Sequence, residues 1–352
     1  MSTEDVIFFE HPSSDGSVVA EARLNIPPTL NALTLDAVEA MTPKMKDWAE
    51  RDEVAAVIVT GEGDKAFCAG GDVQALYHAA TENLVAGRTV NDYPERFFAA
   101  EYRLDYIMHC YEKPLLTLGH GIVMGGGYGL FSASNFRVVT QRTRLAFPEI
   151  TIGLFPDAGG TVVMRNLPPK IAALLTMTGG QVNATDALAL GVGTHLIDHE
   201  GRADFLEGLK QLNWQAGSQD TNTEVLQNYL ATQTHVGGLP SSDVAEVDIE
   251  TIDLSNLKAC FDSILALEGT SKWMDRGIAN LRNGCPVTAG IIFKQLGLGP
   301  TLSLAECFMT ELAIATNCLS RPDFVEGVRA LLIDKDQSPK WSVKSIDDLS
   351  PS

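Results

Sequence analysis

The chain has 352 residues, 45% of them hydrophobic and 20% charged, so it is long and apolar enough to bury a sizeable core. Its formal net charge of −19 at pH 7 argues against a nucleic acid or an anionic membrane as the main partner. An anionic substrate would need a local basic patch against this background.

The six cysteines are scattered, without a CxxC pair or a His cluster at metal-ligand spacing. We interpret them as reduced, mostly buried thiols and expect no metal site. The first residues carry acids and lack the pattern of a signal or transit peptide. No apolar run approaches the ~20 residues of a membrane span. These features predict a cytoplasmic protein without a membrane partner.

Short β-rich runs alternate with helical patterns in the first half, which predicts an α/β architecture. We expect strands at Val6–Phe9, Val18–Leu24, Val54–Thr60, Leu115–Leu118 and Phe136–Thr140, and helices at Thr34–Arg51 and Phe97–Cys110.

Helical patterns dominate from about residue 165 onward. We expect helices at Lys170–Thr178, Ala184–Leu190, Ala203–Trp214 and Glu224–Thr232 and, after a polar acidic connection, at 251–267, 271–282, 286–296, 301–319 and 322–332. The sequence therefore predicts an α/β core over residues 1–205 and a mostly helical region over residues 206–352.

A glycine pair, Gly70–Gly71, follows the expected strand Val54–Thr60 and a short turn. Asp72 and a helical pattern come directly after it. The Gly71 N–H would then lie free near a helix start, where it could donate to an anion. The plainer alternative is a tight turn with a helix N-cap and no ligand.

A glycine triplet, Gly125–Gly127, follows the expected strand Leu115–Leu118. Consecutive glycines cost backbone entropy and need a steric reason, either close approach of a ligand or tight helix–strand packing. Two such loops could direct two N–H groups at one oxygen, an oxyanion hole in which each donor is typically worth ~3 kcal/mol. The nearby His120 could act as a base, but a structural role is the expected one.

Two acids, Glu149 and Asp157, lie eight residues apart in apolar surroundings. Such surroundings raise carboxyl pKa values and favour general acid–base chemistry. Asp157 precedes Ala-Gly-Gly, so it could instead be a helix N-cap. Capping is less natural for Glu149, because apolar segments flank it on both sides.

Together these segments resemble the crotonase (enoyl-CoA hydratase/isomerase) superfamily. AFCAGGD at 66–72 is similar to its first oxyanion loop, GHGIVMGGG at 119–127 to its second, FPEITIGLFPDAGG at 147–160 to its catalytic loop, and NIPPTLNALTLDAVEAM at 25–41 to its CoA-contacting segment. The resemblance implies a crotonase-like ββα superhelix (spiral) with a helical C-terminal region. It also implies an oxyanion hole formed by the amides of Gly71 and Gly126, with Gly70, Asp72, Gly125 and Lys65 near the substrate.

Two positions indicate which branch of the superfamily the chain resembles. Hydratases of the superfamily carry a catalytic Glu two residues after the triplet, where this chain has Gly129, and usually Gly where this chain has Asp157. The pattern MGGGxGL…PE…IGLFPDxGG, the block Asp323–Trp341 and the long insert at about 200–285 look like the 3-hydroxyisobutyryl-CoA hydrolase branch.

That branch implies hydrolysis of a short branched 3-hydroxyacyl-CoA, as in valine catabolism, with CoA as part of the substrate and no separate cofactor. Glu149 would activate water or attack the carbonyl, and Asp157 would orient groups and move protons. An enoyl-CoA isomerase or hydratase, and a non-catalytic CoA-ester binding protein, remain the alternatives. Superfamily members often form trimers or hexamers, so a homo-oligomer is possible.

The family often has a basic residue near the CoA nucleotide in the segment corresponding to residues 25–33. Here Pro27, Pro28 and Thr29 offer none. The candidates for the 3′-phosphate contact are Lys65, Arg321 and Lys335.

Overall fold

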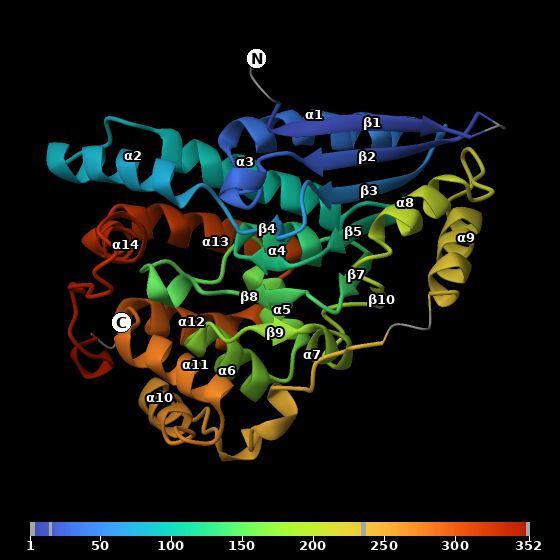
Figure 1. Cartoon of the computed structure of the whole chain (residues 1–352). Coiled ribbons are helices and arrows are strands. Elements are labelled where there is room, and N and C mark those ends of the chain that lie inside the picture. Colours follow the sequence, from blue (N-terminus) through green and yellow to red (C-terminus); the bar gives the residue numbers. More distant parts are fainter. Residues whose placement is uncertain (1–3, 14–15, 234–236, 350–352) are drawn as a thin grey trace. The chain divides into compact units, whose positions relative to one another are not determined.

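The computed structural model describes residues 4–13, 16–233 and 237–349 (Figure 1). Its contacts define two compact units, each assembled from three stretches of chain. The first unit comprises Met1–Gly71, Arg103–Leu145 and Asn183–Ser242, and the second comprises Asp72–Tyr102, Ala146–Val182 and Asp243–Ser352. Each unit draws residues from both sides of position 205, so the division of the chain at that position stays a prediction.

The first unit contains a six-stranded sheet in the order β1-β2-β3-β5-β7-β10. Its strands are β1 (Val6–Pro12), β2 (Val18–Leu24), β3 (Val54–Gly61), β5 (Leu115–Gly119), β7 (Phe136–Thr140) and β10 (His195–Ile197). β1 and β2 are antiparallel, and the other neighbours are parallel (Figure 1). The five expected strands are confirmed, while the three-residue β10 was not predicted.

The inner strands β3 and β5 are buried on both faces, which explains their continuous apolar runs. One part of the sheet's core is made with α8 (Arg202–Lys210) and α9 (Gln219–Ala231), whose Phe205, Leu209, Leu226 and Leu230 pack with strand residues such as Ile58. The helix α1 (Leu35–Glu50) contacts β1, β2 and β3, and Thr34 caps its N-terminus.

A second sheet has four short strands in the order β4-β6-β8-β9. They are β4 (Ala66–Cys68), β6 (Ile122–Met124), β8 (Arg144–Ala146) and β9 (Val182–Asn183). Sequence analysis did not predict them, because two or three residues are too few to show a period. The short helices α4 (Gly126–Ser132) and α7 (Ala184–Ala189) follow β6 and β9.

The second unit is mainly helical. It contains α2 (Val73–Ala86), α5 (Gly160–Asn166), α6 (Pro169–Thr178), α10 (Leu257–Leu265), α11 (Lys272–Asn283), α12 (Pro286–Leu298), α13 (Leu304–Leu319), α14 (Pro322–Val328) and the start of α3 (Tyr93–His109). α6, α10, α11 and α12 share a core that includes Leu174, Ile264, Ile278 and Ile292. The expected helical C-terminal region is confirmed.

Short turns complete the chain. The 3-10 turns are Pro27–Thr29, Glu149–Thr151, Val244–Glu246, Ile249–Thr251, Gly299–Thr301 and Ile346–Asp348, and a π turn spans Arg329–Ile333.

Four predicted helix starts were wrong by several residues. α3 begins at Tyr93 rather than Phe97, and α9 begins at Gln219 rather than Glu224. Capping explains the other two. The helix expected over 251–267 begins at Leu257, because the Asn256 side chain accepts the Ala259 amide. The helix expected over 301–319 begins at Leu304, where Ser303 and Glu306 form a capping box. At the other end, the helix expected over 322–332 passes into the π turn at Arg329.

The cysteines are free, and all except the exposed Cys110 are buried, as predicted. Among the described residues, no helix combines the length and the apolar character needed to cross a membrane.

Candidate active site

The two glycine-rich loops lie side by side within the first unit. β4 and β6 are parallel neighbours, so the loops that follow them leave the same edge of the sheet. A Cβ placed on Gly70 would lie 3.2 Å from the Met124 carbonyl oxygen and 3.8 Å from the Gly126 amide nitrogen. The fold thus brings Gly70–Gly71 next to Gly125–Gly126.

Glycine is required in these loops for two different reasons. Gly70 and Gly125 have φ values of +110° and +51°, which side chains disfavour. A Cβ on Gly127 would lie 2.4 Å from the Cys68 carbonyl oxygen, because α4 packs closely on β4. The packing alternative therefore holds for Gly127. Gly126 is the first residue of α4, so its amide has no acceptor within the helix.

Asn31 anchors the segment of residues 25–33 beside these loops, and sequence analysis missed it. Its buried side chain accepts the Ile26 amide and donates to the carbonyl oxygens of Glu62 and Ala66. The Leu33 amide then donates to the Gly70 carbonyl at 2.8 Å. An Asn between apolar residues in a loop could have signalled this role.

The polar residues expected near the glycine loops have local tasks. Asp72 caps α2 by accepting the amides of Gln74 and Ala75, as the N-cap alternative predicted. His120 Nε2 contacts the Gly63 carbonyl oxygen at 3.0 Å, and burial lowers the pKa of His120 to about 4, which fits a structural role. The Lys65 side chain is exposed. The substrate contacts of Asp72 and Lys65 stay predictions.

Glu149 and Asp157 belong to the second unit, and each side chain is only 4% exposed. Glu149 begins a 3-10 turn, and its Oε2 has no hydrogen-bond partner among the described residues. Burial, followed by the charges of Asp157 and Glu101, raises the pKa of Glu149 well above its usual range. Such a carboxyl is a strong base once it is ionised.

Asp157 accepts a 2.6 Å hydrogen bond from the Tyr102 hydroxyl. Burial raises the pKa of Asp157 to about 6, although this hydrogen bond works in the opposite direction. Asp157 is not the N-cap of α5, because Gly159 occupies that position. Burial thus raises the pKa of both acids, and the Tyr102 hydroxyl opposes this rise at Asp157.

Three further buried groups surround these acids, and sequence analysis missed all of them. They are Glu101 and Tyr102 on α3 and Glu311 on α13, none more than 3% exposed. Burial, followed by the charges of Asp157 and Glu311, raises the pKa of Glu101 well above its usual range. Burial also raises the pKa of Glu311 to about 7. Glu311 is the one acid among the apolar buried residues of α13, and this pattern could have marked it.

The C-terminal block seen in the sequence packs against the loop that carries the acids. A Cβ on Gly153 would lie 2.6 Å from the Asp323 carbonyl oxygen, and one on Gly327 would lie 2.5 Å from the Ile152 backbone. Both glycines are thus fixed by close packing between residues 149–157 and α14.

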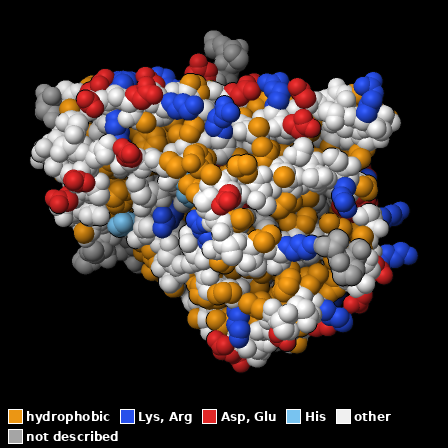
Figure 2. All heavy atoms as spheres, turned by 180° about the vertical axis from the view of Figure 1, so that it is seen from behind, with side chains coloured by type: hydrophobic (Ala, Val, Ile, Leu, Met, Phe, Trp, Pro, Cys, Tyr) orange, Lys and Arg blue, Asp and Glu red, His pale blue; other side chains and the backbone are white. Residues whose placement is uncertain are grey.

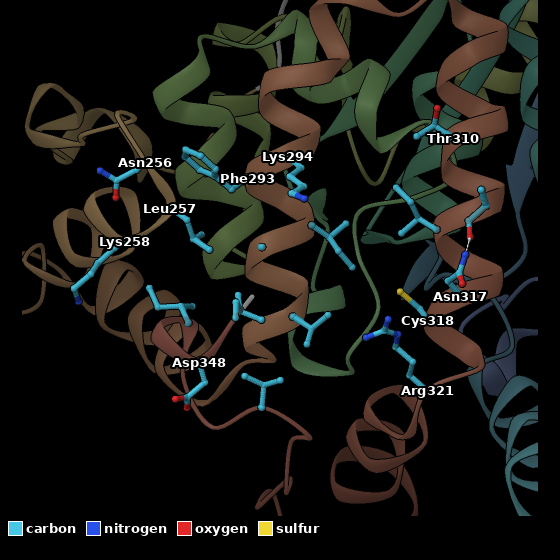
Figure 3. Close-up of a pocket in the computed structure, with 18 residues that line it drawn as sticks. Asn256, Leu257, Lys258, Phe293, Lys294, Thr310, Asn317, Cys318, Arg321 and Asp348 are labelled. Carbon is cyan, nitrogen blue, oxygen red and sulfur yellow. Dashed lines mark hydrogen bonds between the residues drawn. The ribbon is translucent and has the colours of Figure 1, made fainter. Parts of the chain in front are cut away.

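The second unit also holds a cavity of about 1100 Å³ between α12, α13 and the C-terminal segment (Figure 3). Its lining is mostly apolar and includes Phe293, Lys294, Cys318 and Arg321, but neither Glu149 nor Asp157. Arg321, a candidate for the phosphate contact, therefore lies at this cavity, and the contact itself stays a prediction.

On the face seen in Figure 2, Lys and Arg side chains are scattered among acidic and apolar ones. That face offers no single large basic patch. Within the described part of the chain, no group of three or more His, Cys, Asp or Glu side chains could hold a metal ion.

Residues 19–352 match a family model described as enoyl-CoA hydratase/isomerase. The chain belongs to this family. Curated relatives named "3-hydroxyisobutyryl-CoA hydrolase, mitochondrial" include a Danio rerio protein, 35% identical over 98% of this chain and 87% of its own length. A Homo sapiens protein of the same name is 34% identical over 93% of this chain and 82% of its own length.

Solved structures confirm the crotonase fold. A carnitinyl-CoA dehydratase from Mycobacterium thermoresistibile has a TM-score of 0.83 and 28% identity, over 99% of this chain and 94% of its own. An enoyl-CoA hydratase from Rhodobacter sphaeroides has a TM-score of 0.82 and 26% identity, over 99% of this chain and 95% of its own.

Proposed function

We propose that this chain is an acyl-CoA thioester hydrolase acting on short branched 3-hydroxyacyl groups, with 3-hydroxyisobutyryl-CoA as the first candidate. The products would be 3-hydroxyisobutyrate and CoA, as in valine catabolism. The observation that carries the proposal is the buried Asp157, hydrogen-bonded to Tyr102 and electrostatically coupled to Glu149. The names of relatives at about one-third identity over nearly the whole chain support it.

The distribution of acids favours hydrolysis over hydration. Family hydratases use a second Glu two residues after the glycine triplet, and Gly129 occupies that position here. Asp157 instead supplies a second acid with a pKa of about 6, close to the range needed for proton transfer at neutral pH.

The proposed reaction consumes one water. The ionised Glu149 removes a proton from water while the water oxygen bonds to the thioester carbon. The amides of Gly71 and Gly126 donate to the carbonyl oxygen as it gains charge. The C–S bond then breaks, and the thiolate of CoA takes a proton whose transfer Asp157 directs.

A covalent variant uses the same residues. The Glu149 carboxylate attacks the carbonyl carbon and expels the thiolate, and water then hydrolyses the anhydride. A single turnover in heavy-oxygen water can detect the covalent route. Label appears in Glu149 only if water attacks the enzyme carbonyl of the anhydride, whereas a base mechanism leaves Glu149 unlabelled.

The decisive experiment compares 3-hydroxyisobutyryl-, 3-hydroxypropionyl- and crotonyl-CoA. Free thiol is followed with a thiol-reactive dye, and hydration of crotonyl-CoA by loss of its conjugated absorbance. Rapid thiol release from the first two without hydration of the third is the expected result. Hydration of crotonyl-CoA without thiol release would overturn the proposal.

A second candidate is an enoyl-CoA hydratase or isomerase, because the two solved structures above are of proteins named as a dehydratase and a hydratase. An isomerase can move a proton with one carboxylate, so it would survive replacement of Asp157. A hydrolase should not. Tight binding of the CoA ester with no turnover over hours would instead support a non-catalytic binding protein.

The remaining expectations belong to the same proposal. Lys65, Arg321 and Lys335 are the candidates for the CoA 3′-phosphate, and replacing the correct one should raise KM without lowering kcat. A cytoplasmic location and a homo-oligomer also stay predictions; the relatives above are named mitochondrial proteins.

A further inference from the structure

The turn that carries Asp157 has an unfavourable backbone. Ala158 has φ +51°, in the left-handed region that residues with a Cβ rarely adopt, and Gly159 follows at +84°. Ala158 is fully buried. Strain of this kind persists only where surrounding contacts hold it.

Glu311 supplies such contacts from far along the chain. Its Oε2 accepts the Gly159 amide and its Oε1 accepts the Thr161 amide, each at 2.8 Å. Gly159 is the N-cap of α5 and has no side chain with which to cap it. The Glu311 carboxylate therefore caps α5 and fixes the residues directly after Asp157.

A second side chain holds the same turn. Gln295 on α12 donates from Nε2 to the Pro156 carbonyl oxygen at 2.9 Å and to the Thr161 hydroxyl at 3.0 Å. Together with Tyr102, these contacts fix Asp157 through its side chain and through the backbone on either side of it.

A carboxyl group is a costly choice for this task. Glu311 is 0% exposed, and burial and the nearby charge of Asp157 both oppose its ionisation. A carboxylate nevertheless offers two oxygens in a fixed fork, and here both are used by amides. Glutamine keeps the shape, but its NH2 group would face one of the two backbone amides, donor against donor, where the acid has an accepting oxygen.

We propose that Glu311 is a positioning residue for the hydrolysis: its carboxylate holds the strained turn at Ala158 so that Asp157 keeps its hydrogen bond to Tyr102. This inference rests on the proposed function. Glu311 itself touches no reacting atom in the scheme above.

The central variant is Glu311→Gln. A small misplacement of a reacting group can cost ~10²-fold, so kcat should fall roughly 10- to 100-fold with little change in KM. Glu306→Gln is the matched control, because Glu306 also caps a helix by accepting a backbone amide, that of Ser303, but is exposed and far from the turn in sequence. Its kcat should equal that of wild type.

The pH profile separates positioning from simple electrostatics. If Asp157 loses its bond to Tyr102, the pKa of Asp157 rises, and its limb in the profile moves to higher pH. If Glu311 acted only through its charge, removing a negative neighbour would move that limb to lower pH. A shift to lower pH, or none, overturns the proposal.

A double-mutant cycle with Tyr102→Phe adds an independent test. Both changes free the Asp157 carboxylate from its hydrogen bond to Tyr102, so their effects on kcat should be strongly non-additive. Multiplicative losses would show that Glu311 acts through overall folding and would overturn the positioning role. If Glu311→Gln does not melt cooperatively, the same measurements are made on Glu311→Asp. This variant keeps the acid on a shorter side chain.

Amide hydrogen exchange measures the protection of the backbone amides in the turn and needs no substrate. In Glu311→Gln, the peptide containing Gly159 and Thr161 should lose protection, while a peptide from α11 should not. Unchanged protection overturns the Glu311 proposal whatever the wild-type enzyme hydrolyses. Absence of hydrolysis by wild type, with protection lost in the variant, would count against the proposed function alone.

Discussion

The hydroxyl of Tyr102 donates a hydrogen bond of 2.6 Å to Oδ2 of Asp157, and both side chains are almost completely buried. Burial and three neighbouring acids, Asp157, Glu101 and Glu311, raise the pKa of Tyr102 well above its usual range. The phenol therefore remains a donor throughout the working pH range, and it stabilises the ionised form of Asp157.

Replacing Tyr102 by Phe tests this relationship. A hydrogen bond to a charged group contributes about 1.5–3 kcal/mol, so the pKa of Asp157 should rise and kcat at neutral pH should fall roughly 10- to 100-fold. The measurement is the pH dependence of kcat. Tyr106→Phe, an exposed tyrosine on the same helix, is the control. An unchanged pH profile in Tyr102→Phe would mean that the ionisation of Asp157 does not set the pH dependence of kcat.

Replacing Asp157 by Asn tests the assignment of the second acid. Loss of a general acid or base usually costs ~10²–10⁴-fold, and thioester hydrolysis should fall by that order. Glu149→Gln should be at least as damaging. Isomerisation that persists in Asp157→Asn would instead identify the one-carboxylate isomerase. Near-normal hydrolysis in Glu149→Gln would exclude Glu149 as base and as nucleophile.

Replacing Glu101 by Gln tests the electrostatic coupling among the acids. The charge of Glu101 helps to raise the pKa of Glu149, so its removal should move the Glu149 limb of kcat/KM to lower pH. Glu95→Gln, an exposed acid on the same helix, should leave the limb in place. A limb that moves to higher pH in Glu101→Gln would contradict this arrangement.

Glu101→Gln should also change how the free energy of unfolding depends on pH. Glu101 has a raised pKa in the folded chain, so above the ordinary glutamate value of 4.5 the unfolded chain ionises while the folded chain keeps the proton. The free energy of unfolding of wild type therefore falls as pH rises through this range. Glu101→Gln lacks this contribution, so its stability relative to wild type should increase with pH. Urea unfolding at several pH values measures the difference.

Replacing Gly127 by Ala tests the packing of α4 on β4. The new Cβ would lie 2.4 Å from a backbone oxygen that cannot swing away, and such overpacking typically costs about 1–3 kcal/mol. Gly297→Ala is the contrasting change, because this helical residue is exposed and no atom outside its own stretch of helix lies within 4 Å of the new Cβ. It should stabilise the chain by up to ~1 kcal/mol. Equal thermal stability of the two variants would contradict the reasoning.

Sequence analysis found the parts of the site that are local in the chain. The glycine loops are visible in the sequence because a positive φ or a close backbone approach excludes side chains, as at Gly70 and Gly127. Glu149 and Asp157 share one loop, so their apolar surroundings are visible in a short window. The long strands and most helices follow from apolar runs and periodicity.

The partners of these residues could not be located in the same way. Tyr102 is 55 residues from Asp157, and Glu311 is 150 residues from Thr161. A periodic pattern shows that each lies on the buried face of a helix, alongside Phe98 or Phe308, but it does not show which distant loop that face meets. The short strands β4 and β6 were missed for the related reason that their pairing, rather than their own sequence, defines them.

The hydrogen bond from Gly159 to Glu311 spans 152 residues, and this separation has a consequence for biosynthesis. A nascent chain that already contains Glu149 and Asp157 still lacks the carboxylate that binds the amides directly after Asp157. The loop can reach its final conformation only after α13 has left the ribosome, so chains that end before α13 should be unable to preorganise the acid pair. Competence for catalysis would therefore be among the last properties that the growing polypeptide acquires.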